Sequence, residues 1–277
     1  MQRLIVCGFV MGLSLGCAGQ SDGPLTWEEF QDQAYRGPDG VYVVNGDEPA
    51  ENSDRLHEYY VHYLNSFEEM DGIGMTQQGL AINRFQGHDD KWSATAAQNL
   101  TYCVARSGPG SFTNPEYYAT TLATGLAAVT WETHANVKFT HDLSQDDNCT
   151  TSNHNVLFPV QKTCQHAFLG RAFFPSTPIG QARSVLFDCD ALNLDNSQPL
   201  SLLGVAIHEF GHVLGFRHEQ TRPEAGQCFE DNNWRALTVY DSKSAMHYPW
   251  CNGTNTGDFA LTALDKQGAR LAYPGAD

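Results

Sequence analysis

The 277-residue chain is poor in basic residues and lacks a hydrophobic run long enough for a membrane span. It has 16 Lys and Arg against 32 Asp and Glu, and its net charge of −16 argues against nucleic acid or an anionic membrane surface as a partner. The apolar run of residues 4–15 is too short to cross a bilayer as a mature helix. We find no internal repeat or low-complexity tract, so repeat architectures are excluded.

The N-terminus resembles an export signal. Arg3 precedes the apolar run, which ends in Leu-Ser-Leu-Gly-Cys at residues 13–17. This ending is similar to a bacterial lipobox, in which the cysteine is lipidated and becomes the new N-terminus. Ser14 stands where leucine is usual, and the alternative is an ordinary signal peptide cleaved near Ala18. We expect residues 1–17 to be a signal peptide of an exported protein, either lipid-anchored to the bacterial cell envelope through Cys17 or secreted.

Cysteine is absent from residues 25–91, and no C-x-x-C pair occurs anywhere, which weighs against a cysteine metal site. An even number of cysteines beyond the signal segment predicts disulfides in an exported chain. Six cysteines allow 15 pairings, and nearness along the chain favours Cys149 with Cys164 and Cys228 with Cys251. The six are Cys103, Cys149, Cys164, Cys189, Cys228 and Cys251.

The chain divides at about residue 92. In residues 18–91, a small polar tether (18–24) precedes helical patterns at 25–34 and 54–70, a strand and turn at 40–47, and a glycine-rich linker at 70–79. Residues 92–277 carry a mixed α/β pattern. Strands are expected at 100–105, 137–140, 156–160, 170–174 and 184–187, and helices at 115–134 and 201–214. In the helix at 115–134, Asn114 is the expected N-cap, and the apolar stripe is Tyr118, Ala119, Leu122, Leu126 and Val129.

The segment His-Glu-Phe-Gly-His-Val-Leu-Gly-Phe-Arg-His at residues 208–218 is the strongest functional signal. His208 and His212 are four residues apart, so they project from one face of a helix. Gly215 permits the turn that brings His218 back towards them. Three imidazoles with Glu209 beside them indicate a catalytic zinc site with one open position. The surrounding helix is apolar on most sides, so these polar groups are buried and need partners.

Downstream, His218-Glu219 is followed by Ser-Ala-Met-His-Tyr at residues 244–248. Together these motifs resemble the astacin-type metzincin metallopeptidases, over about residues 92–277. The resemblance implies an α+β, zincin-like catalytic domain. Such a domain has a twisted, mostly parallel sheet with an antiparallel edge strand, a long backing helix and an active-site helix. Here a small N-terminal region precedes it, and residues 261–273 look like the closing helix.

The resemblance also implies roles for single residues. His208, His212 and His218 bind one catalytic Zn²⁺, and Glu209 is the general base towards a zinc-bound water. Tyr248 is similar to the tyrosine that serves as an additional, switchable zinc ligand and can swing to the oxyanion. Three further residues have implied or expected roles: Met246 is a hydrophobic floor, Glu219 contacts a trimmed N-terminus, and His247 is structural.

The implied activity is hydrolysis of peptide bonds in a protein or peptide substrate. We expect the substrate to lie extended along the strand at 170–174, with specificity set around Pro249 and Trp250. His166 is expected to be a surface residue. Asp188 and Asp190 are expected to cap or brace loops, with a structural calcium as the alternative.

Residues 25–91 resemble a pro-segment, because astacin zymogens place an aspartate of an F-x-G-D motif on the zinc. Asp47 follows Asn-Gly without the phenylalanine, and Asp89 follows Phe-Gln-Gly-His with an extra residue. Both segments are also typical of plain surface turns, which is the favoured interpretation. Without a cysteine in 25–91, a cysteine switch from this region is excluded.

Two other interpretations stay open. A non-enzymatic envelope lipoprotein could use the same fold for binding, although Glu209 would then have no purpose. A matrixin-like metzincin would lack the tyrosine ligand, and Tyr248→Phe discriminates between the two enzyme types. Substrate preference and oligomeric state are left undetermined.

Overall fold

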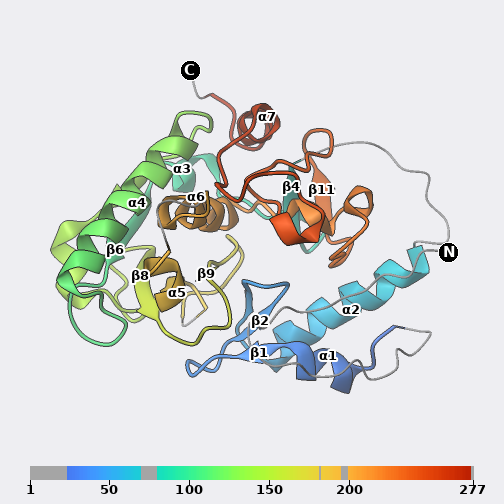
Figure 1. The fold of residues 1–277 in the computed structure, drawn as a ribbon, viewed down its shortest axis with the longest axis horizontal. Helices are drawn as coiled ribbons and strands as arrows, with labels where there is room; N and C mark the ends of the chain where they lie inside the picture. The colour runs from blue at the N-terminus through green and yellow to red at the C-terminus, as the bar shows by residue number, and fades with distance from the viewer. Residues whose placement is uncertain (1–23, 70–79, 181, 195–198, 276–277) are drawn as a thin grey trace.

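A computed structural model describes residues 24–69, 80–180, 182–194 and 199–275. The N-terminal region, blue in Figure 1, lies against one side of a larger region that contains the main sheet. The expected signal peptide, its Cys17 and the linker 70–79 lie outside the described residues. Within the described ranges, no helix is both long and apolar enough to span a membrane.

The N-terminal region has its own small core. Its three-stranded antiparallel sheet has the order β1-β2-β3 and packs with α2 around Val44, Ala50, Leu56 and Tyr59. Thr26 begins α1 through a capping box with Glu29. The predicted helices and the strand and turn at 40–47 are therefore present. The elements are α1 (Trp27–Gln33), β1 (Tyr35–Arg36), β2 (Tyr42–Val44), β3 (Glu48–Ala50) and α2 (Ser53–Glu69).

Residues 80–89, which the sequence analysis placed in the N-terminal region, pack with the larger region. Leu80 and Ile82 are fully buried in the main core. β4 (Ala81–Phe85) pairs with β5 (His88–Asp89) on one side and with β11 (Trp234–Ala236) on the other. Residues 80–89 therefore pack as part of the larger region, because β4 pairs with β11, which lies far away in the sequence.

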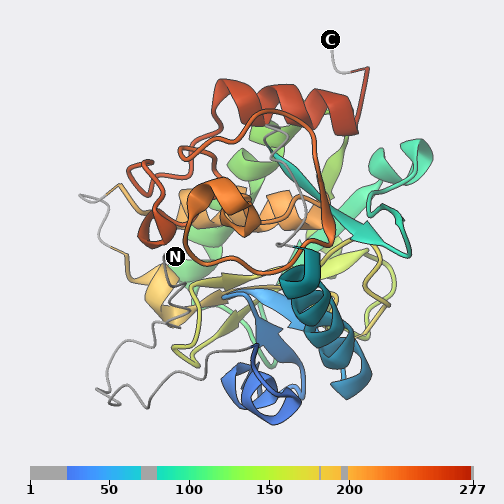
Figure 2. The same ribbon diagram turned by 90° about the vertical axis from the view of Figure 1, so that its right-hand side faces the viewer.

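The main sheet has the predicted topology. Its order is β7-β6-β8-β10-β9, in which β7, β6, β8 and β10 are parallel and β9 is an antiparallel edge strand. The helices α4 and α6 lie on the same side of this sheet in Figures 1 and 2. The strands are β6 (Leu100–Val104), β7 (Phe139–His141), β8 (Phe158–Thr163), β9 (Gly170–Arg171) and β10 (Val185–Asp188).

The long helix α4 (Asn114–Glu132) is present as predicted, but the face expected to be buried is the exposed one. Its large apolar side chains Tyr118, Leu122, Leu126 and Val129 are 45–66% exposed. The buried face carries mostly small residues, which let α4 approach α6 closely, and Trp131. The indole Nε1–H of Trp131 donates to the Ile207 carbonyl oxygen at 2.9 Å. The N-cap is Thr113 rather than Asn114.

The remaining helices belong to the larger region. Helix α6 is the predicted active-site helix, begun by the N-cap Ser201. α7 is the predicted closing helix, and Asp188 caps α5 as predicted. These elements are α3 (Ala94–Ala97), α5 (Cys189–Leu192), α6 (Leu202–Val213) and α7 (Ala263–Ala272), with the 3₁₀ turns Leu143–Asn148, Glu219–Thr221, Pro223–Ala225 and Pro249–Cys251.

Three disulfides join the six cysteines. Cys228–Cys251 is the predicted pair. The predicted Cys149–Cys164 pair is wrong, because Cys149 bonds to Cys103 of the interior strand β6, and Cys164 bonds to Cys189 at the start of α5. The sheet brings β6 under the turn that contains Cys149, with the two Cα atoms 5.6 Å apart. Nearness in sequence could not foresee this.

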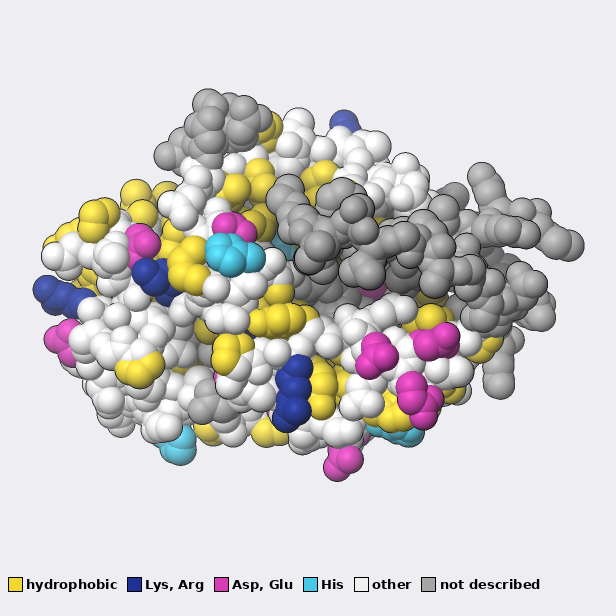
Figure 3. Space-filling model, turned by 60° about the horizontal axis from the view of Figure 1, so that its bottom comes forward, with side chains coloured by type: hydrophobic (Ala, Val, Ile, Leu, Met, Phe, Trp, Pro, Cys, Tyr) yellow, Lys and Arg dark blue, Asp and Glu magenta, His cyan; other side chains and the backbone are white. Residues whose placement is uncertain are grey.

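The acidic composition is visible on the surface of the N-terminal region. Figure 3 shows acidic side chains on the side of the molecule where this region lies. Glu28, Glu29 and Asp32, in α1, are exposed there. In contrast, the carboxylates of Asp47 and Glu48 in the same region are buried against the larger region.

Candidate metal centre and catalytic cleft

Helix α6 places the first two histidines of the motif. His208 and His212 are buried on one face, and their Nε2 atoms lie 3.2 Å apart. Each Nδ1 faces a backbone carbonyl oxygen, that of Ala245 for His208 at 2.7 Å and that of Phe216 for His212 at 2.8 Å. A carbonyl only accepts, so each Nδ1 carries the proton and each Nε2 presents a lone pair to the centre.

Gly215 directs the chain back to the third histidine, as predicted. It has φ +93°, and a side chain there would collide with the Asp90 carbonyl group. The chain then runs beside β4, where the Arg217 N–H donates to the Ala81 carbonyl oxygen at 2.8 Å. This pairing fixes the backbone next to His218, which is fully buried.

The turn at residues 244–248 supports the centre from below. Met246 is fully buried and packs against Gly211 of α6. Asp265 of α7 holds the turn by accepting from the Ser244 hydroxyl at 2.6 Å and from the Ala245 N–H at 2.9 Å. Since the Ala245 carbonyl orients His208, the closing helix is linked to a metal-ligand candidate through two hydrogen bonds.

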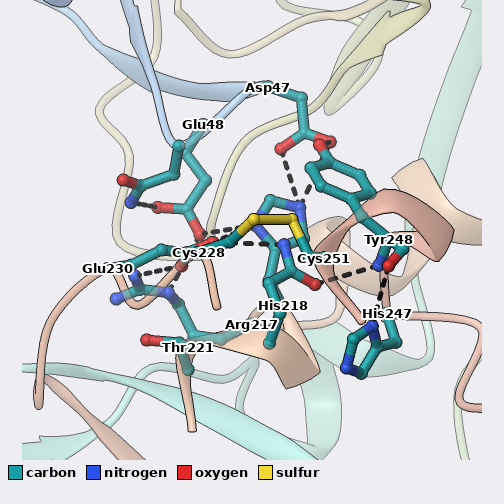
Figure 4. Close-up of polar contacts among 12 residues, drawn as sticks. Asp47, Glu48, Arg217, His218, Thr221, Cys228, Glu230, His247, Tyr248 and Cys251 are labelled. Carbon is teal, nitrogen blue, oxygen red and sulfur yellow. Dashed lines mark hydrogen bonds and ion pairs between the residues drawn. A yellow bond between two sulfur atoms is a disulfide. The ribbon is translucent and has the colours of Figure 1, made fainter. Parts of the chain in front are cut away.

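Asp47 of the N-terminal region lies where the three histidines converge. Its carboxylate oxygens are 3.3 Å from Nε2 of His208, 3.4 Å from that of His212 and 3.1 Å from that of His218. The Tyr248 hydroxyl donates to it at 2.5 Å. Figure 4 shows Asp47 entering from the β2–β3 hairpin above His218 and Tyr248. Asp47 is 3% exposed, so its assignment to a surface turn is wrong.

The Asn45-Gly46 turn makes this approach possible. Both residues have positive φ, 56° and 103°, which suits a tight hairpin turn. A β-carbon at Gly46 would lie 2.8 Å from the Tyr248 hydroxyl oxygen. Glycine is therefore required both by the turn and by the contact with the tyrosine.

The buried charges perturb one another strongly. Burial alone would raise the pKa of Asp47, but His218 and His212 hold that pKa well below its usual range. Burial lowers the pKa of His212 to about 4, so its imidazole is neutral near pH 7. Burial also disfavours a charged His218, yet the carboxylates of Asp47 and Glu230 outweigh it and raise the pKa well above its usual value.

These residues fit a zinc ion. Two imidazole lone pairs that face each other at 3.2 Å repel unless a cation lies between them. Three nitrogens and one carboxylate oxygen are a donor set that zinc prefers. The ligand atoms of Asp47, His208, His212 and His218 all lie within 4.8 Å of one another. The centre is thus chemically complete for one metal ion.

Glu209 lies beside the centre, against the edge strand. A β-carbon at Gly170 would lie 2.6 Å from Cδ of Glu209, so only glycine leaves room for this side chain. Burial raises the pKa of Glu209 well above its usual range, and the Asp47 carboxylate adds to the rise. Next to it, buried Arg171 pairs with Asp39 of the N-terminal region at 2.9 Å. The N-terminal region therefore lies against the edge strand as well as the metal centre.

A second charge network adjoins the centre, and the sequence analysis did not identify it. The fully buried Arg217 contacts Glu48 at 2.9 Å, Glu230 at 2.8 Å and Asp231 at 3.1 Å. Burial raises the pKa of Glu48, although Arg217 opposes the rise. No motif spacing links these residues. Only the position of Arg217 inside the histidine motif was a usable signal.

Four residues discussed from the sequence do not join the centre. Asp89 pairs with the exposed Arg235 at 2.6 Å. Glu219 accepts from the Asp241 N–H at 3.0 Å and lies 3.5 Å from Arg222, and its burial raises its pKa to about 8. His247 contacts the Tyr240 hydroxyl at 2.9 Å. His166 is an exposed residue that contacts Asp190 at 2.9 Å.

Known proteins resemble part of the chain. Residues 91–225 match the family model described as Matrixin, a range that contains Glu209 and the three histidines but ends before Tyr248. The chain is 29% identical over 112 residues to Protein SpAN of Strongylocentrotus purpuratus, which covers 30% of this chain and 18% of that protein. It is 29% identical over 137 residues to a bone morphogenetic protein 1 homolog of the same organism, covering 43% of this chain and 19% of that protein.

Blastula protease 10 of Paracentrotus lividus is 30% identical over 98 residues, covering 27% of this chain and 16% of that protein. The chain thus spans less than a fifth of the length of these relatives. A solved structure of myroilysin aligns with a TM-score of 0.47 and 18% identity, over 70% of this chain and 98% of that one.

Proposed function

We propose that this chain carries a metzincin-type zinc metallopeptidase domain and is a zinc endopeptidase held latent by Asp47 of its own N-terminal region. One observation carries the proposal: the Asp47 carboxylate lies among the three inward Nε2 atoms and accepts a hydrogen bond from the Tyr248 hydroxyl. A carboxylate in that place blocks the position that an attacking water needs.

His208, His212 and His218 would hold the zinc ion, which when bound polarises a carbonyl group and lowers the pKa of water. Glu209, one residue after the first ligand, takes the proton from the attacking water and delivers it to the departing amine. The Tyr248 hydroxyl is placed to donate a hydrogen bond to the oxyanion once Asp47 has left. In this scheme, Asp47 and the oxyanion use the same donor in turn.

The substrate is a protein or peptide that lies extended along β9. This edge strand can add main-chain hydrogen bonds to a bound peptide, and Glu209 packs directly against its Gly170. The ion pair between Asp39 and Arg171 supports the location, because the N-terminal region already contacts this strand. Trp250 is exposed and stacks on Tyr248 with ring centroids 4.5 Å apart, so it can form a wall of the substrate site.

We place the enzyme outside the cytoplasm, on the bacterial cell envelope through a lipidated Cys17 or in secreted form. Three disulfides among the described residues support an oxidising compartment. Mass spectrometry of the exported protein tests the lipidation and locates the N-terminus. A mature form that starts after residue 69 would show removal of the N-terminal region.

The latency is tested with full-length Asp47→Ala and its matched control Asp89→Ala, on casein or a quenched peptide with added zinc. Asp47→Ala is expected to cleave at least tenfold faster than the parent chain. Asp89→Ala is expected to match the parent, because Asp89 contacts only surface groups such as Arg235. Equal rates for the two variants contradict latency through Asp47.

The chemistry is tested in the Asp47→Ala chain. Adding Glu209→Ala or a zinc chelator is expected to abolish cleavage, and zinc restores it only in the chelated sample. Cleavage that survives either treatment contradicts the mechanism. A chain that binds zinc but cleaves nothing in any of these forms favours the non-enzymatic envelope lipoprotein.

A further inference from the structure

The three ligand histidines differ in what holds their outer nitrogen. For His208 and His212 the partner of Nδ1 is a neutral backbone carbonyl. For His218 it is the carboxylate of Glu230, at 2.7 Å. A carboxylate acceptor fixes the tautomer of a histidine, orients its ring and makes its other nitrogen a stronger donor to a metal. The Glu230 side chain can therefore set the ring orientation of His218 and its strength as a metal ligand.

Glu230 is itself held at both oxygens. Oε1, besides the His218 contact, accepts from the Gln220 side-chain amide at 3.3 Å. Oε2 accepts from Nη2 of Arg217 at 2.8 Å. The Gln220 amide oxygen in turn accepts from the Tyr248 N–H at 3.0 Å. One carboxylate thus connects the third ligand with the backbone of the tyrosine.

The segment that carries Glu230 is anchored covalently. Cys228 lies two residues before Glu230 and is joined to Cys251, three residues after Tyr248. Figure 4 shows this disulfide beside the His218 and Tyr248 side chains. The Glu230 side chain is 5% exposed. Such a buried, anchored acceptor loses little order when the ligand histidine binds a metal.

We infer that Glu230 is the positioning residue for His218, and that Arg217 and Gln220 keep Glu230 in place. The inference rests on the proposed function, because it concerns the third ligand of that same metal centre. In this role Glu230 acts on the metal centre through His218. The neighbouring Asp231 binds the same Arg217 at 3.1 Å but forms no hydrogen bond or ion pair with His218 in the described part of the chain, which makes it a matched control.

The experiment measures zinc affinity by competition with a chromogenic chelator, in full-length Asp47→Ala, so that the affinity reports the three histidines without the Asp47 carboxylate. Glu230→Ala is expected to bind zinc 10- to 100-fold more weakly than this parent. Glu230→Gln is expected to fall between the two, because the amide oxygen still accepts from His218 but carries no charge. Asp231→Asn is expected to stay within about twofold of the parent.

Loss of folding does not explain the expected pattern. Arg217 keeps Asp231 and Glu48 as partners when Glu230 is neutralised, so no buried cation is left alone. The melting temperature of each metal-free variant is measured alongside the affinity. Asp231→Asn and Glu230→Gln are expected to lose similar stability, while only Glu230→Gln loses zinc affinity. Excess zinc should restore cleavage by Glu230→Gln, which a purely structural defect would not allow.

The outcomes separate this inference from the proposed function. If the Asp47→Ala parent itself fails to bind zinc, the proposed function fails. If the parent binds zinc, and both Glu230→Gln and Glu230→Ala bind it as tightly as the parent does, the positioning role is overturned and the proposed function stands. If Asp231→Asn weakens zinc binding as much as Glu230→Gln does, the effect belongs to Arg217 and the positioning role of Glu230 is overturned as well.

Discussion

Gly170→Ala tests whether the edge strand positions Glu209, the proposed general base. Gly170 lies on β9, and a β-carbon there would lie 2.6 Å from Cδ and 2.7 Å from Cγ of Glu209. Carbon atoms in contact prefer about 3.5–4 Å. The strand cannot easily withdraw, because residues 170 and 171 pair with Phe187 and Leu186 of β10. Glu209 must therefore give way by about 1 Å.

A shift of that size predicts a specific kinetic loss. Misplacing a catalytic group by about 1 Å costs about 100-fold in rate, which corresponds to about 2.7 kcal/mol of transition-state stabilisation. We expect this loss in kcat rather than in KM, because the edge strand keeps its main-chain groups for a peptide. The melting temperature is expected to change by only a few degrees, since one methyl group is added at a polar contact.

The assay compares kcat/KM on a quenched peptide for Gly170→Ala and Gly125→Ala, both in the full-length Asp47→Ala chain. Gly125 lies in α4, and a β-carbon there meets nothing within 4 Å. Alanine is better than glycine inside a helix by about 0.8–1.0 kcal/mol, so this control should be more stable and equally active. A Gly170→Ala enzyme within threefold of its parent refutes the reasoning. A large drop in its melting temperature would show that the lost activity comes from unfolding rather than from a displaced Glu209.

Three further predictions concern stability and are checked by urea unfolding. Trp131→Ala should lower the free energy of unfolding by about 3–5 kcal/mol, because this ring of α4 is fully buried against α6. Leu126→Ala on the exposed face of α4 should change it by less than about 0.5 kcal/mol. Equal losses for the two variants would contradict the assigned face. Asp265→Ala should cost about 1–3 kcal/mol for each buried donor that it strands, namely the Ser244 hydroxyl and the Ala245 N–H, while exposed Asp258→Ala serves as the control. The double variant Cys103→Ala, Cys149→Ala removes a disulfide that spans a sequence separation of 46. The lost restriction of the unfolded chain should lower the free energy of unfolding by about 4 kcal/mol. A loss below about 1 kcal/mol would show that the loop is ordered without the bond.

Local sequence patterns were sufficient for the features that local geometry dictates. The four-residue spacing of His208 and His212 predicted their common helix face, and Gly215 predicted the turn with positive φ. The strands of the main sheet lie within a few residues of the predicted ones, because short apolar runs mark buried parallel strands. The resemblance then supplied the mostly parallel sheet with its antiparallel edge strand, which the sheet order confirms.

Packing between distant elements was not predictable in the same way. In α4, the apolar stripe predicted that Leu122 and Leu126 face the core, but close helix packing selects the small residues of the opposite face. The partner of Cys149 depends on which strand the sheet places beneath it, and that strand is β6. Both errors have one origin, since pattern alone does not say which neighbour a face or a side chain will meet.

The N-terminal hairpin shows why the charge network also escaped sequence reasoning. Asp47 and Glu48 are consecutive, and so are Arg217 and His218, yet the two pairs are separated by about 170 positions. The hairpin sets Asp47 against His218 and Glu48 against Arg217. The first contact adds a carboxylate to the candidate metal donor set, whereas the second is an ion pair that needs no metal. Docking of the N-terminal region and the proposed blocking of the metal centre therefore rest on different side chains of one turn. Neither chemistry can be read from a motif, because each exists only once the turn is folded against the other region.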